Sequence, residues 1–167
     1  MPVRRLRSAQ RYKFERLVRG TDFSTGRSMI NQVTRFMTAQ YGTKTVERPL
    51  VSIVDDDESV RESLPDLVRE LGFAAQAFSS AGEFLASECA SETGCLILDI
   101  KMPGMSGPEL QEELKRRNRH MPIVFITAQT SETLRAEMLA QGAVGCLTKP
   151  FSDTALLDAL NSALRAN

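Results

Sequence analysis

Apolar and polar residues alternate in blocks along the chain from residue 50 onward. Short apolar runs have the length of β-strands and cover residues 50–54, 73–78, 94–100, 122–127 and 143–148. Each run is followed by a stretch with helical spacing of apolar residues, near residues 58–71, 80–88, 107–118, 131–141 and 152–165. Gly72 and Gly142 end the first and fourth of these stretches, as glycine commonly does after a helix. The pattern therefore predicts five β–α units.

Three of the apolar runs carry no alternating polar positions. The runs at 50–54, 94–100 and 122–127 are almost continuously apolar, which is typical of strands covered on both faces. Strands that alternate with helices favour a parallel sheet with helices on both sides, and right-handed crossovers restrict its topology. We predict an α/β fold with a doubly wound, five-stranded parallel sheet and five helices.

The N-terminal segment lacks this block pattern and differs in charge. Residues 1–48 contain eleven Lys and Arg residues against three acids, whereas the remainder contains ten against eighteen. Only a weak apolar stripe at residues 5–19 suggests a helix there. We predict two regions: a basic extension over 1–48, disordered or partly helical, and one folded domain over 49–167. Because the last predicted helix reaches the end of the sequence, we expect no output domain after it.

The composition narrows the cellular setting. No apolar run approaches the length of a membrane span, and no apolar segment follows the basic start as in a secretory signal. Cys89, Cys95 and Cys146 are an odd number of cysteines with no close pair, so we interpret them as reduced thiols. We expect a cytoplasmic protein without a membrane partner.

Polar residues follow the predicted strands at the point where each strand ends. They are Asp55, Asp56, Asp99, Thr127 and Lys149. Because the carboxyl ends of parallel strands meet at one edge of the sheet, where ligands of such folds bind, we expect these side chains to form one cluster. Asp57 and Glu58 also follow the first strand, but we expect them to serve the next helix as N-terminal acids.

The chemistry of this cluster points to phosphoryl groups. Carboxylates about 4 Å apart repel by about 4 kcal/mol per pair at an effective dielectric of about 20, so the fold needs a positive charge among them. Mg²⁺ prefers hard carboxylate oxygens and water, and Lys149 adds a further cation. Carboxylates, Mg²⁺, a hydroxyl and a lysine suit a bound phosphoryl group, and one carboxylate could receive it as an aspartyl phosphate.

Four blocks, "IVDDDE", "LILDIKMPGMSG", "IVFITAQ" and "GAVGCLTKPF", resemble a two-component response-regulator receiver domain of the FixJ/NarL type. The resemblance covers roughly residues 49–166 and implies the flavodoxin-like strand order 2-1-3-4-5. It implies that Asp99 is the phosphoacceptor and a Mg²⁺ ligand. It further implies that Asp56 binds Mg²⁺ directly, with Asp55 beside it holding a metal-bound water. The main-chain carbonyl of Lys101 would supply another ligand.

The resemblance also implies the rest of the mechanism. Thr127 and Lys149 would contact the phosphoryl group, and Pro150 would follow a cis peptide bond. The phosphoryl donor would be a sensor histidine kinase or a phosphotransfer protein, and the domain would signal by protein–protein contact, with no enzymatic activity beyond its own phosphorylation and dephosphorylation. Cys146 occupies a position where receivers usually carry Tyr or Phe. We therefore expect that an aromatic switch does not operate here in the usual way.

Three other functions are compatible with parts of the sequence. A Mg²⁺-dependent phosphatase could also use an aspartyl phosphate, but such enzymes usually carry an Asp-x-Asp pair, and Ile100 and Lys101 follow Asp99. A DNA-associated regulator could bind nucleic acid weakly through the basic extension, which shows no recognition helix. A nucleotide or flavin carrier would need a phosphate-binding glycine motif, and neither common form is present.

Overall fold

A single parallel sheet forms the centre of the folded domain in the computed structural model, which describes residues 48–165. The predicted basic extension over 1–48 lies outside the described residues except for Arg48. The strands are β1 (Leu50–Val54), β2 (Ala74–Phe78), β3 (Thr93–Asp99), β4 (Ile123–Thr127) and β5 (Gly145–Thr148). All neighbours pair in parallel, and their order is β2-β1-β3-β4-β5, which confirms the predicted fold class and strand order.

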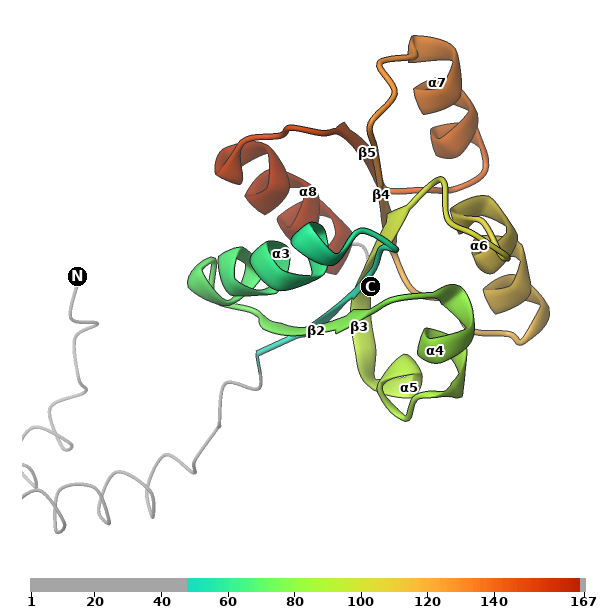
Figure 1. Ribbon diagram of the computed structural model, residues 1–167, viewed down its shortest axis with the longest axis horizontal. Coiled ribbons are helices and arrows are strands. Elements are labelled where there is room, and N and C mark those ends of the chain that lie inside the picture. Colours follow the sequence, from blue (N-terminus) through green and yellow to red (C-terminus); the bar gives the residue numbers. More distant parts are fainter. Residues whose placement is uncertain (1–47, 166–167) are drawn as a thin grey trace, which may run out of the picture. The chain divides into compact units, whose positions relative to one another are not determined.

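Helices cover both faces of this sheet (Figure 1). One face carries α3 (Glu58–Glu70) and α8 (Asp153–Arg165). The other carries α4 (Ala81–Ala86), α5 (Cys89–Glu92), α6 (Gly107–Arg116) and α7 (Glu132–Ala140). None of the described helices is long and apolar enough to cross a bilayer.

The number of helices corrects the sequence prediction. The helix expected near residues 80–88 is α4, which ends at Ala86, and the short helix α5 at Cys89–Glu92 was not predicted, so the described residues contain the six helices α3 to α8 instead of five. Ser87 takes an extended conformation with ψ of 149°, and its N–H and hydroxyl both donate to the carbonyl oxygen of Phe84, at 3.1 and 2.9 Å. A serine side chain that bonds the preceding turn competes with helix continuation, and the chain restarts as α5.

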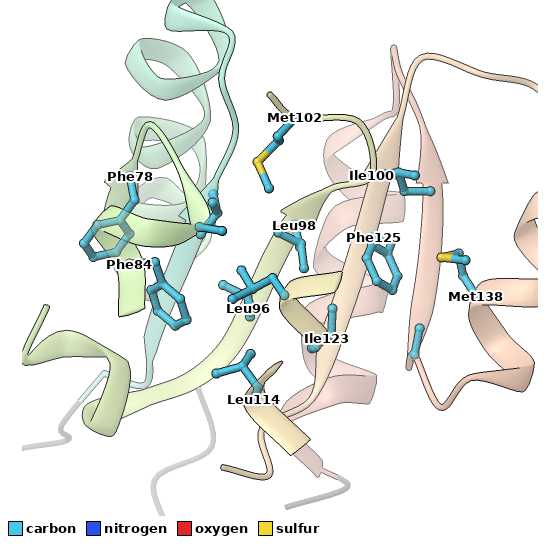
Figure 2. Close-up of a cluster of buried hydrophobic side chains, with 14 of the residues drawn as sticks. Phe78, Phe84, Leu96, Leu98, Ile100, Met102, Leu114, Ile123, Phe125 and Met138 are labelled. Atoms are coloured by element: carbon cyan, nitrogen blue, oxygen red, sulfur yellow. The ribbon is translucent and has the colours of Figure 1, made fainter. Parts of the chain in front are cut away.

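Two apolar clusters, one on each face of the sheet, explain why the central strands contain almost no polar residues. Figure 2 shows the cluster under α4 to α7, where the rings of Phe78 and Phe84 meet edge to face at 5.4 Å. Leu96, Leu98 and Phe125 extend this cluster along β3 and β4. The cluster on the opposite face packs the remaining strand residues against α3 and α8. The predicted double-sided burial of β1, β3 and β4 is thus confirmed.

Helices α3, α6 and α7 end in the same turn geometry. Gly72 and Gly142 follow α3 and α7 with φ of 100° and 96°, as their positions in the sequence predict. Asn118 takes the same place after α6 with φ of 54°, and paired backbone bonds close the turn, including Arg119 N–H to the carbonyl of Leu114 at 2.9 Å. Because Asn tolerates the left-handed region better than other residues with side chains, α6 ends before the predicted residue 118.

Candidate functional site

Three of the predicted site residues meet at the carboxyl edge of the sheet. The Lys149 ammonium donates a hydrogen bond to Asp55 Oδ2 at 2.7 Å and to Asp99 Oδ1 at 2.8 Å. Asp55 follows β1, Asp99 ends β3 and Lys149 follows β5, so three separate strands position this group. The peptide bond between Lys149 and Pro150 is cis, as the resemblance implied.

Burial of the two carboxylates makes the lysine necessary. Asp55 is 1% exposed and Asp99 is 7% exposed, and a carboxylate so far from water needs a positive partner. Burial raises the pKa of Asp55, against the opposing effect of the hydrogen bonds from Lys149 and from the Asp57 N–H. Burial by itself would lower the pKa of Lys149, but its hydrogen bonds to the two aspartates raise it above the usual value. Lys149 is therefore a fixed cation at neutral pH.

Thr127 reaches the same edge from β4, between the strands that carry Asp99 and Lys149. Its main-chain carbonyl accepts a hydrogen bond from the Lys149 N–H at 2.8 Å. Its buried hydroxyl accepts one from the Gln129 N–H at 3.1 Å, in the loop that leads to α7. The hydroxyl is thus tied to a loop residue and not to either aspartate, and a rearrangement of this loop would free it.

The adjacent acids after β1 have different surroundings. Asp55 is buried, and its Oδ1 accepts a hydrogen bond from the Asp57 N–H at 2.9 Å. Asp56 is exposed. Asp57 caps α3 by accepting a hydrogen bond from the Ser59 N–H at 2.9 Å, as expected for an acid at a helix start. Asp56 is therefore the acid of this group that is free to take a ligand from solvent.

The main chain after β3 also serves the site. The Lys101 N–H donates to Asp99 Oδ2 at 2.7 Å, so each oxygen of the Asp99 carboxylate has one hydrogen-bond donor. Lys101 itself is exposed. These two donors fix the orientation of the Asp99 carboxylate at the edge of the sheet.

The donor chemistry of this edge fits Mg²⁺ better than a closed metal site. Across residues 48–165, no three Asp, Glu, His or Cys side chains converge as a preassembled metal cluster. Mg²⁺ does not require one, because it usually retains several water ligands and takes one or two carboxylates from the protein. Asp55 and Asp99 already share one cation, and the exposed Asp56 lies next to Asp55 in the chain. The residues present therefore suit a partly hydrated magnesium ion.

Two residues that the sequence analysis did not single out support the site. Arg61 of α3 reaches back and donates from Nη1 to the main-chain carbonyl of Asp55 at 3.1 Å. Gly107, the first residue of α6, packs so closely against the main chain of Asp99 that any side chain would overlap it. Neither contact has a signal in the sequence, because each joins separate elements of the fold.

Comparisons with known proteins place these features in a family. Residues 51–161 match the response regulator receiver domain model. The chain is 43% identical over 121 residues to nodulation protein W of Bradyrhizobium diazoefficiens, covering 72% of this chain and 53% of that protein. It is 41% identical over 116 residues to the response regulator protein TodT of Pseudomonas putida, covering 70% and 51%. The chain thus spans about half the length of these curated relatives.

Solved structures agree with the sequence comparisons. The response regulator StyR aligns with a TM-score of 0.66 and 46% identity, covering 72% of this chain and 61% of that one. The crystal structure of FixJ-N aligns with a TM-score of 0.65 and 36% identity, covering 71% and 95%. Receiver domains act in phospho-accepting signalling, generally with Mg²⁺ at acidic residues and a histidine kinase or phosphotransfer protein as partner. This chain belongs to the response regulator receiver domain family of bacterial two-component systems.

Proposed function

We propose that Asp99 accepts a phosphoryl group from a sensor histidine kinase or phosphotransfer protein in a Mg²⁺-dependent reaction, and that the phosphorylated domain signals by contact with another protein. The observation that carries this proposal is the shared ammonium: Lys149 binds Asp55 and Asp99 at 2.7 and 2.8 Å at the carboxyl edge of the sheet. The Asp99 carboxylate can act as the nucleophile because the fixed cation beside it offsets its repulsion of the anionic phosphoryl donor.

The transfer is an in-line displacement at phosphorus. An oxygen of the Asp99 carboxylate forms the new bond to phosphorus, and the bond from phosphorus to the donor's histidine nitrogen breaks, with its electron pair leaving on that nitrogen. Lys149 stabilises the charge on the phosphoryl oxygens because its ammonium already contacts the attacking carboxylate. The Thr127 hydroxyl donates a hydrogen bond to a phosphoryl oxygen once the loop around Gln129 rearranges.

The acidic edge would hold the metal. Asp55, Asp56, Asp99 and the main-chain carbonyl of Lys101 are the groups we assign to Mg²⁺, with water completing its coordination. When bound, Mg²⁺ neutralises charge on the phosphoryl oxygens and offsets the repulsion among the carboxylates. Arg61 would support this set indirectly, since its hydrogen bond to the Asp55 carbonyl holds the turn from which Asp56 projects.

A groove beside the lysine offers a docking place for the donor protein. A hollow of about 400 Å³ lies between α3 and the segment after Lys149, with Leu64, Leu67 and Phe151 among its apolar lining residues. Because Lys149 itself lines the groove, a helix of the donor seated there would bring its phosphohistidine close to Asp99. This position supports a protein as phosphoryl donor.

The chemistry is tested with a small donor. Incubation of the full chain with acetyl phosphate and Mg²⁺ should place one hydroxylamine-labile phosphate on Asp99, detected by mass spectrometry. Asp99→Asn should abolish the label, and Lys149→Met should slow labelling by about 10²-fold or more. Asp158→Asn and Lys115→Met, which alter exposed residues of α8 and α6, are the matched controls. Labelling of another residue, or equal labelling without Mg²⁺, would refute the proposal.

Docking is tested by separating two donors. Phe151→Ala and Leu67→Ala should slow transfer from the cognate kinase while leaving labelling by acetyl phosphate unchanged, whereas Leu139→Ala on the exposed side of α7 should change neither. Continuous release of phosphate from a small phosphate ester, many turnovers per Asp99, would instead favour a phosphatase. Steeply salt-dependent DNA binding that is lost on deleting residues 1–46 would support a DNA-associated role for the extension.

A further inference from the structure

A second hollow lies at the sheet edge opposite Asp99. Its volume is about 310 Å³, within the range of small-ligand pockets, and its floor includes Ile123 and Val144, at and just before the first residues of β4 and β5. Thr127 ends β4 and Lys149 follows β5 at the other edge of the sheet, where Asp99 ends β3. The hollow is therefore separate from the phosphorylation site.

Two helix ends build this pocket. The turn at Asn118, after α6, sends the chain back toward the sheet and directs Arg119 and His120 to the pocket wall. The corresponding turn at Gly142, after α7, brings up the main chain of Gln141 on the other side. Both turns follow from residues that adopt positive φ, so the pocket is part of the folded framework.

Two residues that line this pocket carry unpaired polar atoms. Within the described part of the chain, two buried side-chain polar atoms lack a hydrogen-bond partner, namely Gln111 Oε1 and an Nη1 of Arg119. Both residues line this pocket, and Gln111 is only 3% exposed. Buried polar groups in folded proteins are nearly always paired, and an unpaired one is costly. Two residues that line one hollow thus hold an acceptor and a cationic donor that have neither a hydrogen-bond partner nor access to solvent.

The hydrogen bonds around Gln111 determine which of its atoms is free. Its Nε2 donates to the carbonyl oxygen of Gln141 at 3.3 Å, and turning the amide over would place Oε1 against that oxygen. Lys115 donates to the same carbonyl at 3.1 Å and pairs with Glu112 at 2.7 Å. Gln111 consequently offers an acceptor that requires a donor from the ligand, whereas Arg119 requires an anionic acceptor.

We propose that this pocket binds a small aliphatic hydroxycarboxylate. The two side chains turn their buried polar atoms toward the ligand, so that its carboxylate pairs with Arg119 and its hydroxyl donates a hydrogen bond to Gln111 Oε1. Its short carbon chain packs on Leu114, Ile123 and Val144. The hydroxyl is preferred over an ammonium as the donor because Lys115 and Arg119 already make this wall positive. A plain carboxylate would satisfy Arg119 and leave Gln111 unpaired.

Titration of the full chain with lactate and propionate tests the pairing of both groups. Backbone amide NMR should show saturable shifts for Gly142 and Val144 with lactate, and propionate should bind about fivefold or more weakly, because it cannot donate to Gln111. Gln111→Leu should remove the preference for lactate, so that the two acids bind alike. Arg119→Met should weaken lactate about tenfold or more. Arg116→Met, a matched change outside the pocket, should alter neither affinity.

The pocket is independent of the phosphorylation chemistry. Asp99→Asn should abolish labelling by acetyl phosphate and leave lactate binding intact, so failure of one proposal does not affect the other. If either pocket variant is poorly folded, Arg119→Lys keeps the charge but loses the forked donors, and it should weaken lactate less than Arg119→Met does. The assignment would be overturned if lactate showed no saturable binding or if propionate bound with equal affinity. It would also be overturned if inorganic phosphate bound and lactate did not.

Discussion

Gly107 lies directly against the main-chain carbonyl of Asp99. A side-chain carbon on Gly107 would overlap that carbonyl oxygen and approach the Phe125 ring to 3.0 Å. The Gly107 N–H also donates to the carbonyl of Ile100 at 3.1 Å, so the loop between β3 and α6 closes tightly on itself. The position of the proposed phosphoacceptor thus depends on the absence of a side chain eight residues later.

Gly107→Ala should displace either the main chain of Asp99 or the start of α6. We expect a loss of about 1–3 kcal/mol in the free energy of unfolding, as for other overpacked sites, and a labelling rate by acetyl phosphate lower by about tenfold or more. Urea unfolding and the time course of phosphorylation measure the two effects. Gly82→Ala, in α4 with open space around the new methyl group, is the control. If the Gly107→Ala variant were labelled at the wild-type rate, the argument would be contradicted.

The sequence predicted the sheet because β1, β3 and β4 are apolar on both faces, a pattern that few other architectures produce. It predicted the sheet-edge cluster because parallel strands align their ends. It did not predict which of Asp55 and Asp56 is buried, since the two acids are identical in type and differ only in the direction each takes when β1 ends. Burial of one and exposure of the other appear only in three dimensions.

Other details depended on local competition that apolar periodicity does not report. Ser87 ends α4 before the predicted residue 88 by bonding Phe84, and Asn118 ends α6 early in the left-handed region. The close packing of Gly107 on Asp99 is a contact between separate elements, so no pattern along the chain could locate it. The bonds from Arg61 to the Asp55 carbonyl and from Gln111 to Gln141 are likewise tertiary.

The buried hydroxyl groups of Ser52 and Thr93 form a hydrogen bond that joins β1 to β3. Removing one of them should lower the free energy of unfolding more than removing the other. Thr93 donates its hydroxyl to the Cys89 carbonyl at 2.6 Å, so in the 2.7 Å contact between Ser52 and Thr93 the Ser52 hydroxyl must be the donor. Thr93→Val would leave the Ser52 donor unpaired, and we expect a cost of about 2–3 kcal/mol, against about 1 kcal/mol for Ser52→Ala. Urea unfolding measures both.

The double variant with Ser52→Ala and Thr93→Val is a stricter test of the hydrogen bond between these two hydroxyl groups. Once Ser52 is alanine, Thr93→Val no longer creates an unpaired donor, so the double variant should lose about 1 kcal/mol less than the two single changes together. Additive losses, within the roughly 0.5 kcal/mol typical of independent sites, would show that the two hydroxyl groups are not coupled.

At position 118, replacing asparagine by glycine should cost less stability than replacing it by alanine. Its φ of 54° is costly for a residue with an ordinary side chain, by about 1–2 kcal/mol, whereas glycine adopts it freely. Asn118→Ala should therefore lower the free energy of unfolding by about 1 kcal/mol, and Asn118→Gly should preserve or raise it. Thermal unfolding measures the order. Asn161→Ala, inside the right-handed helix α8, is the matched control and should be neutral or stabilising. Equal losses at both positions would contradict the role of φ.

Cys95 should make the fold sensitive to alkali. Its thiol lies in β3 opposite Val51, it is fully buried, and burial raises its pKa from 9.0 to about 12. In the folded chain the thiol stays neutral over this interval, while the unfolded chain releases the proton from about pH 9 upward. The contribution of Cys95 to stability is therefore complete below pH 9 and falls with rising pH, by up to about 1.4 kcal/mol per unit, until the folded thiol itself ionises.

Cys95→Val removes this titration and keeps the position apolar, and its effect on packing is the same at both pH values. Between about pH 8 and about pH 10.5, the wild-type chain should lose about 1–2 kcal/mol more unfolding free energy than Cys95→Val does. Urea unfolding at the two pH values gives the difference, in which the lysine, tyrosine and remaining thiol titrations common to both chains cancel. Cys146→Ala provides a second comparison, because burial also raises the pKa of that thiol. Parallel losses in the wild type and Cys95→Val would mean that the Cys95 thiol ionises without unfolding, and that β3 opens locally to admit the charge.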